Sequence, residues 1–223
     1  MDSKLFIQAL SKFLMGLLLI IGLIFIPAGS FEFYHGWIFI CLLFVPMFVV
    51  GIILMVKNPD LLKKRLNSKE KESDQRIVVL IGGLLFLAGF ITAGLNFRFK
   101  WYILPNRVVA LASVIFFLSY LMYAEVLREN TYLSRTIEVQ DNQKVIDTGL
   151  YGIVRHPMYS ATIFMFLSIP LILGSVISFL IFLIYPFSLV TRIKNEEEVL
   201  EKGLEGYTEY KQKVKYRLIP FIW

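Results

Sequence analysis

Cysteine, histidine and charge are scarce in this chain. Its 223 residues include one cysteine and two histidines, and charged residues make up 18%. One thiol permits no internal disulfide and no cysteine-rich metal site, and Cys41, within an apolar run, is expected to be a small buried side chain. The sequence also has no G-x-G-x-x-G after a strand, no P-loop and no H-E-x-x-H. These absences disfavour a Rossmann cofactor domain and a zinc protease, and we expect no metal site.

Apolar residues, in contrast, are abundant. They make up 57% of the chain, against about 45–50% in ordinary soluble domains, and the mean hydropathy is +0.67. The charged residues are bunched between long apolar runs, which is typical of an integral membrane protein. Lysines and arginines that flank membrane spans explain the net charge of +6 better than binding of nucleic acid does.

Four apolar segments are long enough to cross about 30 Å of hydrocarbon as helices. They are Leu5–Ile26, Trp37–Val56, Ile77–Phe97 and Val108–Leu127. The first has features of a signal peptide. With its flank, where Lys12 can reach the interface, it is long enough to span, so we expect it to be retained.

The next apolar region, 158–190, is too long for one simple span. Pro170 and the pair Gly174-Ser175 interrupt it, so we expect a helical hairpin with arms Met158–Leu173 and Val176–Val190. Helices over 191–202 and 207–215 should follow, separated by glycines. The sequence therefore predicts an all-α integral membrane protein with about six transmembrane helices, including this C-terminal hairpin, and a cytoplasmic C-terminal helix.

The distribution of lysine and arginine predicts the orientation. The loop 57–76 and the tail after Thr191 carry seven each and the loop 128–157 carries four, whereas the loop 27–36 has none and 97–107 has three. Six crossings then place both termini and the loops 57–76 and 128–157 in the cytoplasm. We expect a single domain over 1–223, in which 1–127 supply four spans and 128–223 carry the chemistry.

The first candidate for chemistry is the stretch "DTGLYGIVRHPMYS", residues 147–160. Pro157 suits the first turn of a helix and disfavours helical geometry at the residue before it. Arg155 and His156 should therefore lie at the N-terminus of an apolar helix, where backbone N–H groups and the helix dipole favour a carboxylate or phosphate. Alternatively, Arg155 snorkels to lipid head groups and His156 only caps the helix.

The second candidate is "TRIKNEEEVL", residues 191–200. Arg192 and Glu196 are four apart and should share a helix face, and Glu197 should point about 100° away. The alternative is a solvated helix with ordinary ion pairs. The position of Arg192 directly after an apolar span favours function, since ionisable groups there tend to be functional.

Other polar and glycine residues have simpler interpretations. We expect His35 to be a surface residue, Asn96 to hydrogen-bond locally, and Glu125 to pair with a cation or face the cytoplasmic side. Gly82-Gly83 and Gly89 should allow helices to pack closely.

Several segments together resemble a known family. Over 143–223 the chain has "TGLYGIVRHPMY", the hairpin, "RIKNEEEVL", "YTEYKQKV" and "IPFIW", in the order and spacing of the isoprenylcysteine carboxyl methyltransferase family, whose broader group includes phospholipid N-methyltransferases. The resemblance implies that S-adenosylmethionine binds inside a membrane helix bundle. It implies catalytic roles for Arg192, beside the acceptor, and Glu196. The implied cofactor-binding residues are Gln143, Lys144, Val145, Ile146, Tyr151, His156, Pro157, Met158, Tyr159, Glu196 and Glu197.

The residue types suit this cofactor. A helix N-terminus with His156 suits its carboxylate, Glu196 suits its ammonium, and tyrosine rings can hold its sulfonium. The partner would be a lipid or a lipidated small molecule that enters from the bilayer. A cation such as Arg192 suits an anionic acceptor and O-methylation, and the glutamates suit N-methylation of an amine. Two other functions stay open: an NADPH-dependent sterol-type reductase, and a non-enzymatic scaffold or transporter.

Overall fold

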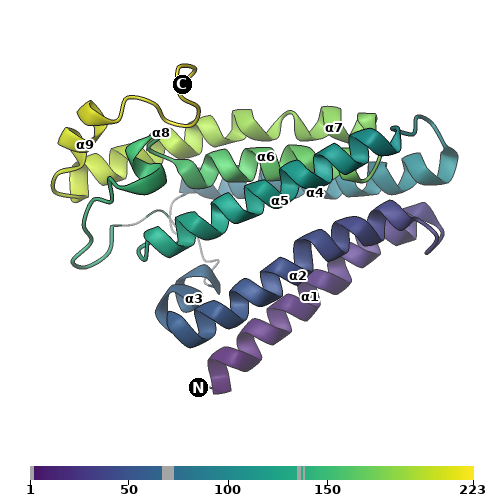
Figure 1. Cartoon of the computed structure of the whole chain (residues 1–223), viewed down its shortest axis with the longest axis horizontal. Coiled ribbons are helices and arrows are strands. Elements are labelled where there is room, and N and C mark those ends of the chain that lie inside the picture. Colours follow the sequence, from purple (N-terminus) through teal and green to yellow (C-terminus); the bar gives the residue numbers. More distant parts are fainter. Residues whose placement is uncertain (1–2, 67–72, 135–136, 138) are drawn as a thin grey trace.

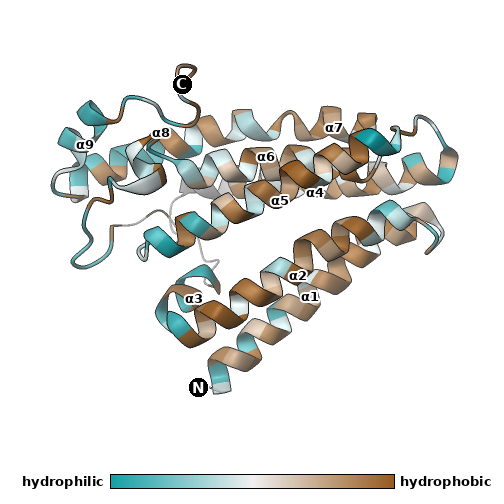
Figure 2. Ribbon diagram, in the orientation of Figure 1, coloured by the Kyte–Doolittle hydropathy of each residue, from teal (hydrophilic) through white to brown (hydrophobic). Residues whose placement is uncertain are grey.

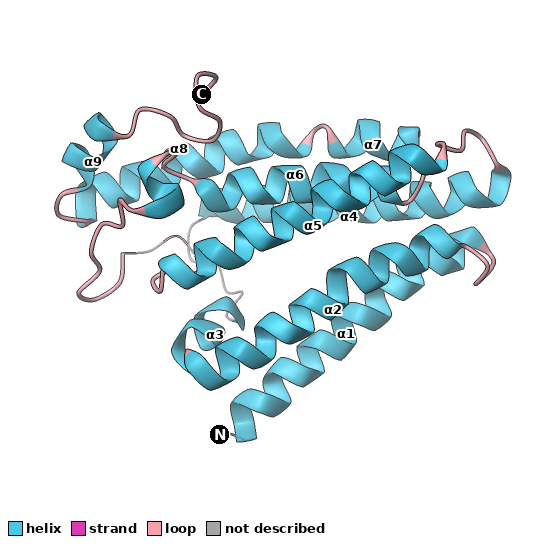
Figure 3. Ribbon diagram, in the orientation of Figure 1, coloured by secondary structure: helices cyan, strands magenta, loops and turns pink. Residues whose placement is uncertain are grey.

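The protein is built from helices. The structure, a computed structural model, describes residues 3–66, 73–134, 137 and 139–223, and these residues form no strand (Figure 3). The long helices are α1 (Ser3–Ala28), α2 (Tyr34–Lys57), α4 (Ser73–Phe99), α5 (Asn106–Glu129), α6 (Pro157–Ile172) and α8 (Tyr185–Gly203). The short ones are α3 (Pro59–Leu66), the 3-10 helix η1 (Gly149–Gly152), α7 (Val176–Phe182) and α9 (Tyr207–Lys213).

Five stretches are long and apolar enough to cross a membrane. They are α1, α2, residues 79–99 of α4, α5, and the stretch 176–203 that α7 and α8 form together. Figure 2 shows hydrophobic colour along much of these helices, hydrophilic colour on α9, and mixed colour on α3. An all-helical integral membrane protein is thus confirmed. Helix α6 has 16 residues, about 24 Å of helix, so a sixth crossing stays a prediction.

The second arm of the predicted hairpin differs from expectation. Helix α7 ends at Phe182 and α8 begins at Tyr185, so the arm is broken in mid-span. Pro186 lies in the first turn of α8, where its missing N–H and its ring prevent continuation of the preceding helix. Helix α8 then runs without a break through Thr191. The predicted start of a helix at Thr191 is therefore wrong, and the polar residues of 191–202 lie on the C-terminal part of α8.

Glycines on α4 have two different environments. A Cβ built on Gly89 would lie 2.1 Å from Cε2 of Phe182, and one on Gly94 would lie 2.6 Å from the Ile24 carbonyl oxygen. The close packing predicted for Gly89 is thus confirmed. Gly94 likewise allows α1 and α4 to pack closely. A Cβ on Gly82 or Gly83 would meet nothing within 4 Å. The prediction of close packing is wrong for that pair, because both residues line a cavity.

Two burial predictions are wrong. His35 is 5% exposed, because it lies in the first turn of α2 directly against Gly174, whose φ of +72° and missing Cβ make room for the imidazole. Cys41 is exposed rather than buried. It lies on an outward face of α2, where lipid in place of water suits a small weakly polar side chain.

Two predictions of local pairing are confirmed. The Asn96 amide donates to the carbonyl oxygen of Tyr102 at 2.9 Å and accepts from its backbone N–H at 3.3 Å. The Asn96 amide nitrogen also lies 3.5 Å from the Gly174 carbonyl oxygen, which links two turns at one end of the bundle. Glu125 accepts from Arg128 at 2.6 and 2.7 Å.

The polar segments gather at one end of the molecule. In Figure 1, α3 and α9 lie at the end opposite to the α1–α2, α4–α5 and α6–α7 turns. The basic loop 57–76, insofar as it is described, and the loop 130–156 therefore share one end, as alternate crossings require. That this end faces the cytoplasm stays a prediction.

Candidate active site

The entry to α6 is fixed by backbone pairing with a distant segment. The N–H of Arg155 donates to the carbonyl oxygen of Tyr216, and that of His156 to the carbonyl oxygen of Arg217, both at 2.9 Å. Pro157 begins α6 and His156 precedes it with φ −126°, but the imidazole makes no capping bond. The alternative that His156 acts as a side-chain cap is therefore wrong, and its ring is available for other contacts.

Glu197 is a buried carboxylate that joins three basic side chains. Its Oε1 accepts from Nε of Arg155 at 2.8 Å and lies 3.2 Å from Nε2 of His156. Its Oε2 lies 2.9 Å from Nη2 of Arg217. Nη1 of Arg155 also donates to the carbonyl oxygen of Val214 at 2.7 Å. Arg155 is 6% exposed, so the alternative that it snorkels to head groups is wrong, and Glu197 contacts the two basic side chains that were predicted to bind an anionic ligand.

A second chain of polar contacts joins α6 to α8. The Tyr159 hydroxyl donates to Oε2 of Glu196 at 2.6 Å and accepts from Nε of Arg192 at 3.0 Å. Nδ1 of His156 lies 4.0 Å from Oε1 of Glu196. Arg192 and Glu196 thus share a face of α8, as their spacing predicts, and Glu197 points to the other side.

These contacts line one cleft at the polar end of the bundle. Apart from Pro157 and Glu197, every residue predicted to contact the cofactor or the acceptor lines it. Pro157 starts α6 behind the cleft, and Glu197 lies behind its wall. The lining also contains Arg155, which the sequence placed beside a bound anion, and residues to which sequence reasoning assigned no role: Asn130, Tyr132, Leu133, Ser134, Ile137, Val199, Leu200, Leu204, Tyr207 and Tyr210.

The side of the cleft formed by residues 143–146 packs against the C-terminal region. Val145 contacts a cluster that contains Leu204, Tyr207 and Tyr210. The Tyr210 hydroxyl donates to the carbonyl oxygen of Tyr151 at 2.8 Å. These contacts bring the "YTEY" stretch to the cleft. In the sequence, that stretch contributed only to the family resemblance. The spacing of its tyrosines gave no indication of which ring would line the cleft.

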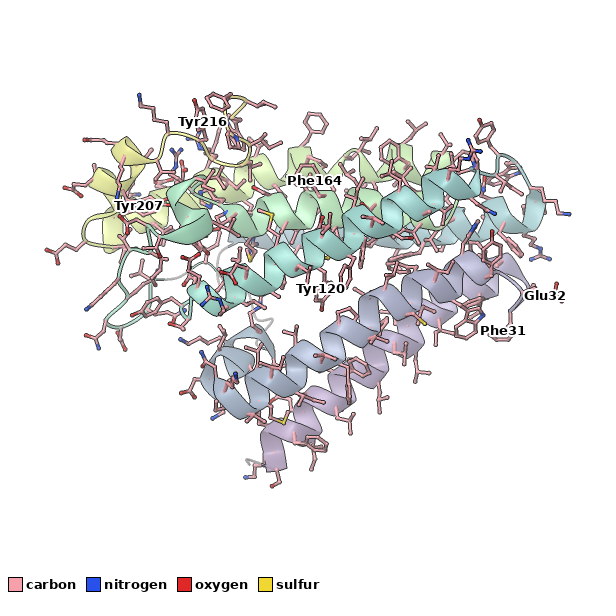
Figure 4. All side chains as sticks on the ribbon, viewed as in Figure 1. Phe31, Glu32, Tyr120, Phe164, Tyr207 and Tyr216 are labelled. Atoms are coloured by element: carbon pink, nitrogen blue, oxygen red, sulfur yellow. The ribbon has the colours of Figure 1, made fainter. Side chains whose placement is uncertain are left out.

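Tyr207 stands out among these residues. It is 4% exposed, and its hydroxyl has no hydrogen-bond partner among the described residues. Figure 4 shows it near α9, at the polar end of the molecule. Burial raises the pKa of the Tyr207 phenol above its ordinary value, so the hydroxyl keeps its proton. A buried hydroxyl without a partner is costly, and one in a cleft can be satisfied by a ligand.

A second cavity, of about 670 Å³, lies between α2, α4, α5, α6 and α8. Aromatic and aliphatic side chains dominate its lining, and Tyr120 of α5 is one of them (Figure 4). Gly82 and Gly83 leave room in its wall. Its described lining has two cations, Arg65 and Arg192, and no carboxylate. The cavity is thus suited to an apolar molecule with an anionic group.

The cleft and this apolar cavity share a wall. Four residues line both: Ser134, Met158, Tyr159 and Arg192. A group held in the cleft and a group held in the apolar cavity would therefore meet beside Tyr159 and Arg192. Such an arrangement suits the transfer of a small group from a polar donor to an apolar acceptor.

Comparison with known proteins agrees with this site. Residues 108–202 match the family model described as the isoprenylcysteine carboxyl methyltransferase family. A Delta(14)-sterol reductase (TM7SF2) of Mus musculus is 31% identical over 91 residues, which is 40% of this chain and 22% of that relative. The chain therefore spans about a fifth of the length of this curated relative. The match of residues 108–202, which hold both predicted catalytic residues, confirms the resemblance and supports membership of the isoprenylcysteine carboxyl methyltransferase family.

Proposed function

We propose that this protein is a membrane methyltransferase that uses S-adenosylmethionine to methylate the carboxylate of a lipid-like acceptor. The observation that carries the proposal is the wall shared by the polar cleft and the apolar cavity, with Tyr159 and Arg192 in it. The family match supports methyl transfer. The apolar cavity between membrane helices supports a lipid-like acceptor that enters from the bilayer.

The residues of the cleft fit S-adenosylmethionine. This molecule has an ammonium, a carboxylate, a ribose, an adenine and a sulfonium. Glu196 is the carboxylate of the cleft wall and suits the ammonium, and the unpartnered hydroxyl of Tyr207 suits a ribose or adenine hydrogen bond. The rings of Tyr151 and Tyr159 suit a sulfonium, whose attraction to an aromatic face is worth about 0.5–2 kcal/mol.

When bound, S-adenosylmethionine supplies an electrophilic methyl group. Transfer to a carboxylate breaks a C–S bond and forms a C–O bond, and the positive charge of the sulfonium and the negative charge of the carboxylate disappear together. No proton moves, so no protein base is needed. Arg192 would hold the acceptor carboxylate, and Tyr159, bonded to both Arg192 and Glu196, would fix the angle between the two reactants.

Glu197 has a positioning role in this proposal. It contacts neither cavity but fixes His156 at the N-terminus of α6. Through Arg155 and Arg217 it also holds the C-terminal segment against the cleft wall. The cleft is thereby formed before a ligand binds, which lowers the entropic cost of binding.

The first experiment is to titrate the purified protein with S-adenosylhomocysteine. We expect saturable binding, weakened in Glu196→Gln. The matched control is Glu198→Gln, two residues along α8, where the carboxylate is exposed and pairs with Lys202. Absence of binding at millimolar concentration would refute the proposed cofactor. Incubation with labelled S-adenosylmethionine and a lipid extract would then identify the acceptor by the label in its product.

The second candidate function is reduction of a sterol-type lipid with NADPH. The similarity to a Delta(14)-sterol reductase favours it. The phosphates of NADPH need several cations, whereas the Arg155 guanidinium of the cleft is already bound by Glu197. We therefore rank it second. Thermal shifts measured with NADPH and with S-adenosylmethionine separate the two functions: stabilisation by NADPH alone would favour the reductase.

A further inference from the structure

Arg65 lies at the end of α3, outside the region that matches the methyltransferase family. It nevertheless reaches the apolar cavity, whose other described cation is Arg192. The family resemblance noted in the sequence covers residues 143–223, and the loop 57–76 had no predicted function beyond orientation. Arg65 is therefore the one charged side chain that the N-terminal half contributes to the described lining of this cavity.

Every described partner of Arg65 is neutral. Its Nη1 donates to the Ser134 carbonyl oxygen at 3.3 Å and lies 4.0 Å from Sδ of Met158. Its Nη2 donates to the Tyr123 hydroxyl, and the guanidinium lies 5.6 Å from the centre of the Tyr123 ring. Ser134 and Met158 belong to the wall shared with the cleft. A half-buried guanidinium is thus held beside that wall with no carboxylate among its described partners.

Helix α3 has other anchors that hold it in place. Leu61 and Leu62 are buried, Nζ of Lys12 donates to the Leu66 carbonyl oxygen at 2.5 Å, and Nζ of Lys64 lies 5.9 Å from the centre of the Tyr132 ring. With these contacts in place, a neutral side chain at position 65 would also seat the helix. A charge facing an apolar cavity is expensive, and a ligand of opposite charge would offset its cost.

We infer that Arg65 is a specificity-determining residue that, together with Arg192, holds the anionic head group of the acceptor in the apolar cavity. The inference rests on the proposed function and adds a residue to it. Guanidinium groups form forked, charge-assisted hydrogen bonds with carboxylates. Methylation neutralises the carboxylate, so the product loses its attraction to both arginines, which favours its release over that of unreacted acceptor.

The test uses three probes with the same tail and different head groups. They are the S-farnesyl thioether of N-acetylcysteine, which is anionic, its methyl ester, which is neutral, and S-farnesylcysteamine, which is cationic. Binding of each is measured on the full chain in nanodiscs of neutral lipid. We expect the wild type to prefer the carboxylate, and Arg65→Met to lose about tenfold in carboxylate affinity, the effect of one charge-assisted hydrogen bond. Ester binding should stay the same.

Two variants act as controls. Lys63→Met removes a charge from the same helix, but Lys63 is exposed and pairs with Asp60, so it should leave all three affinities unchanged. Arg65→Lys keeps the charge and should retain part of the carboxylate preference, whereas Arg65→Gln should not. If Arg65→Met fails to fold, as judged by loss of S-adenosylhomocysteine binding, the comparison of the Lys and Gln variants decides.

Two results would overturn the inference. One is carboxylate affinity in Arg65→Met equal to that of the wild type. The other is an equal loss for carboxylate and ester, which would assign Arg65 a purely structural role. Failure of the proposed function has a different signature: no methyl transfer from labelled S-adenosylmethionine by the wild type. Because the probes are compared by binding and not by turnover, a carboxylate preference that depends on Arg65 can be detected even then.

Discussion

Replacement of Glu197 by glutamine should destabilise the protein and loosen the cleft. The substitution keeps the size of the side chain and removes its charge, which leaves the buried Arg155 without its carboxylate partner. Loss of one member of a buried ion pair costs about 3–5 kcal/mol. The Arg155 and Glu197 side chains are each 4% exposed, whereas the Arg217 side chain is 25% exposed and partly screened by solvent. We therefore expect the lower limit, about 3 kcal/mol.

Thermal melting followed by intrinsic tryptophan fluorescence measures this loss. For a chain of this size, about 2–4 °C per kcal/mol gives a fall in Tm of about 6–12 °C. Binding of S-adenosylhomocysteine should weaken as well, because His156 loses the partner that fixes its ring. Glu198→Gln, on the exposed side of α8, should move Tm by less than about 2 °C, since surface substitutions change stability by about 0.5 kcal/mol or less. A Glu197→Gln protein with the wild-type Tm and affinity would refute the role assigned to this carboxylate.

Three further predictions follow from the geometry. Tyr207→Phe removes a hydroxyl that has no described partner, so Tm should not fall. The Kd for S-adenosylhomocysteine should rise about three- to tenfold, which corresponds to the loss of one hydrogen bond. An unchanged Kd would exclude this hydroxyl from the site. Gly89→Ala should lower the free energy of unfolding by about 1–3 kcal/mol, because the new methyl group overpacks against Phe182. Gly82→Ala should not lower Tm, because a Cβ there meets nothing within 4 Å. Equal effects of the two substitutions would contradict the packing described. Burial raises the pKa of Tyr207 above its ordinary value of 10.0, so its ionisation opposes folding and stability should decline as pH rises above about 10; the Phe variant should decline less in melts between pH 8 and 11.

Much of the site could be predicted because its residues lie close together in the sequence. The i,i+4 spacing of Arg192 and Glu196 placed both on one helix face, and the 100° step to Glu197 placed that residue on another. Pro157 likewise marked the start of α6. These are properties of single helices, and a local pattern determines them.

The partners of these residues were not predictable in the same way. The bonds of Arg155 to Glu197 and Val214 join positions 42 and 59 apart in the chain, and nothing in the local pattern specifies such contacts. The position of Arg65 in the cavity wall was missed for a related reason. Its stretch has the basic composition that orientation alone explains, and only the packing of α3 brings this one side chain to the cavity.

Two errors of burial have one physical cause. The predictions for His35 and Cys41 assumed that water surrounds the whole protein. In water, a histidine between two apolar segments is exposed and a cysteine within an apolar run is buried. In a bilayer the outside of a helix is apolar, so residue type no longer separates inside from outside. Burial then depends on neighbours such as Gly174, which only the structure reveals.

The two cavities draw on different parts of the chain, and this gives the fold a modular character. The described lining of the cleft comes entirely from residues 130–210, whereas helices α2, α3 and α4 supply six of the 18 described lining residues of the apolar cavity. Under the proposed function, substitutions in the N-terminal helices would therefore reshape acceptor choice while cofactor binding is left intact. A chimera that joins residues 1–99 of one such protein to the remainder of another should inherit part of its acceptor preference from the first and its cofactor affinity from the second. In evolution, the same division would let one catalytic half serve many lipids.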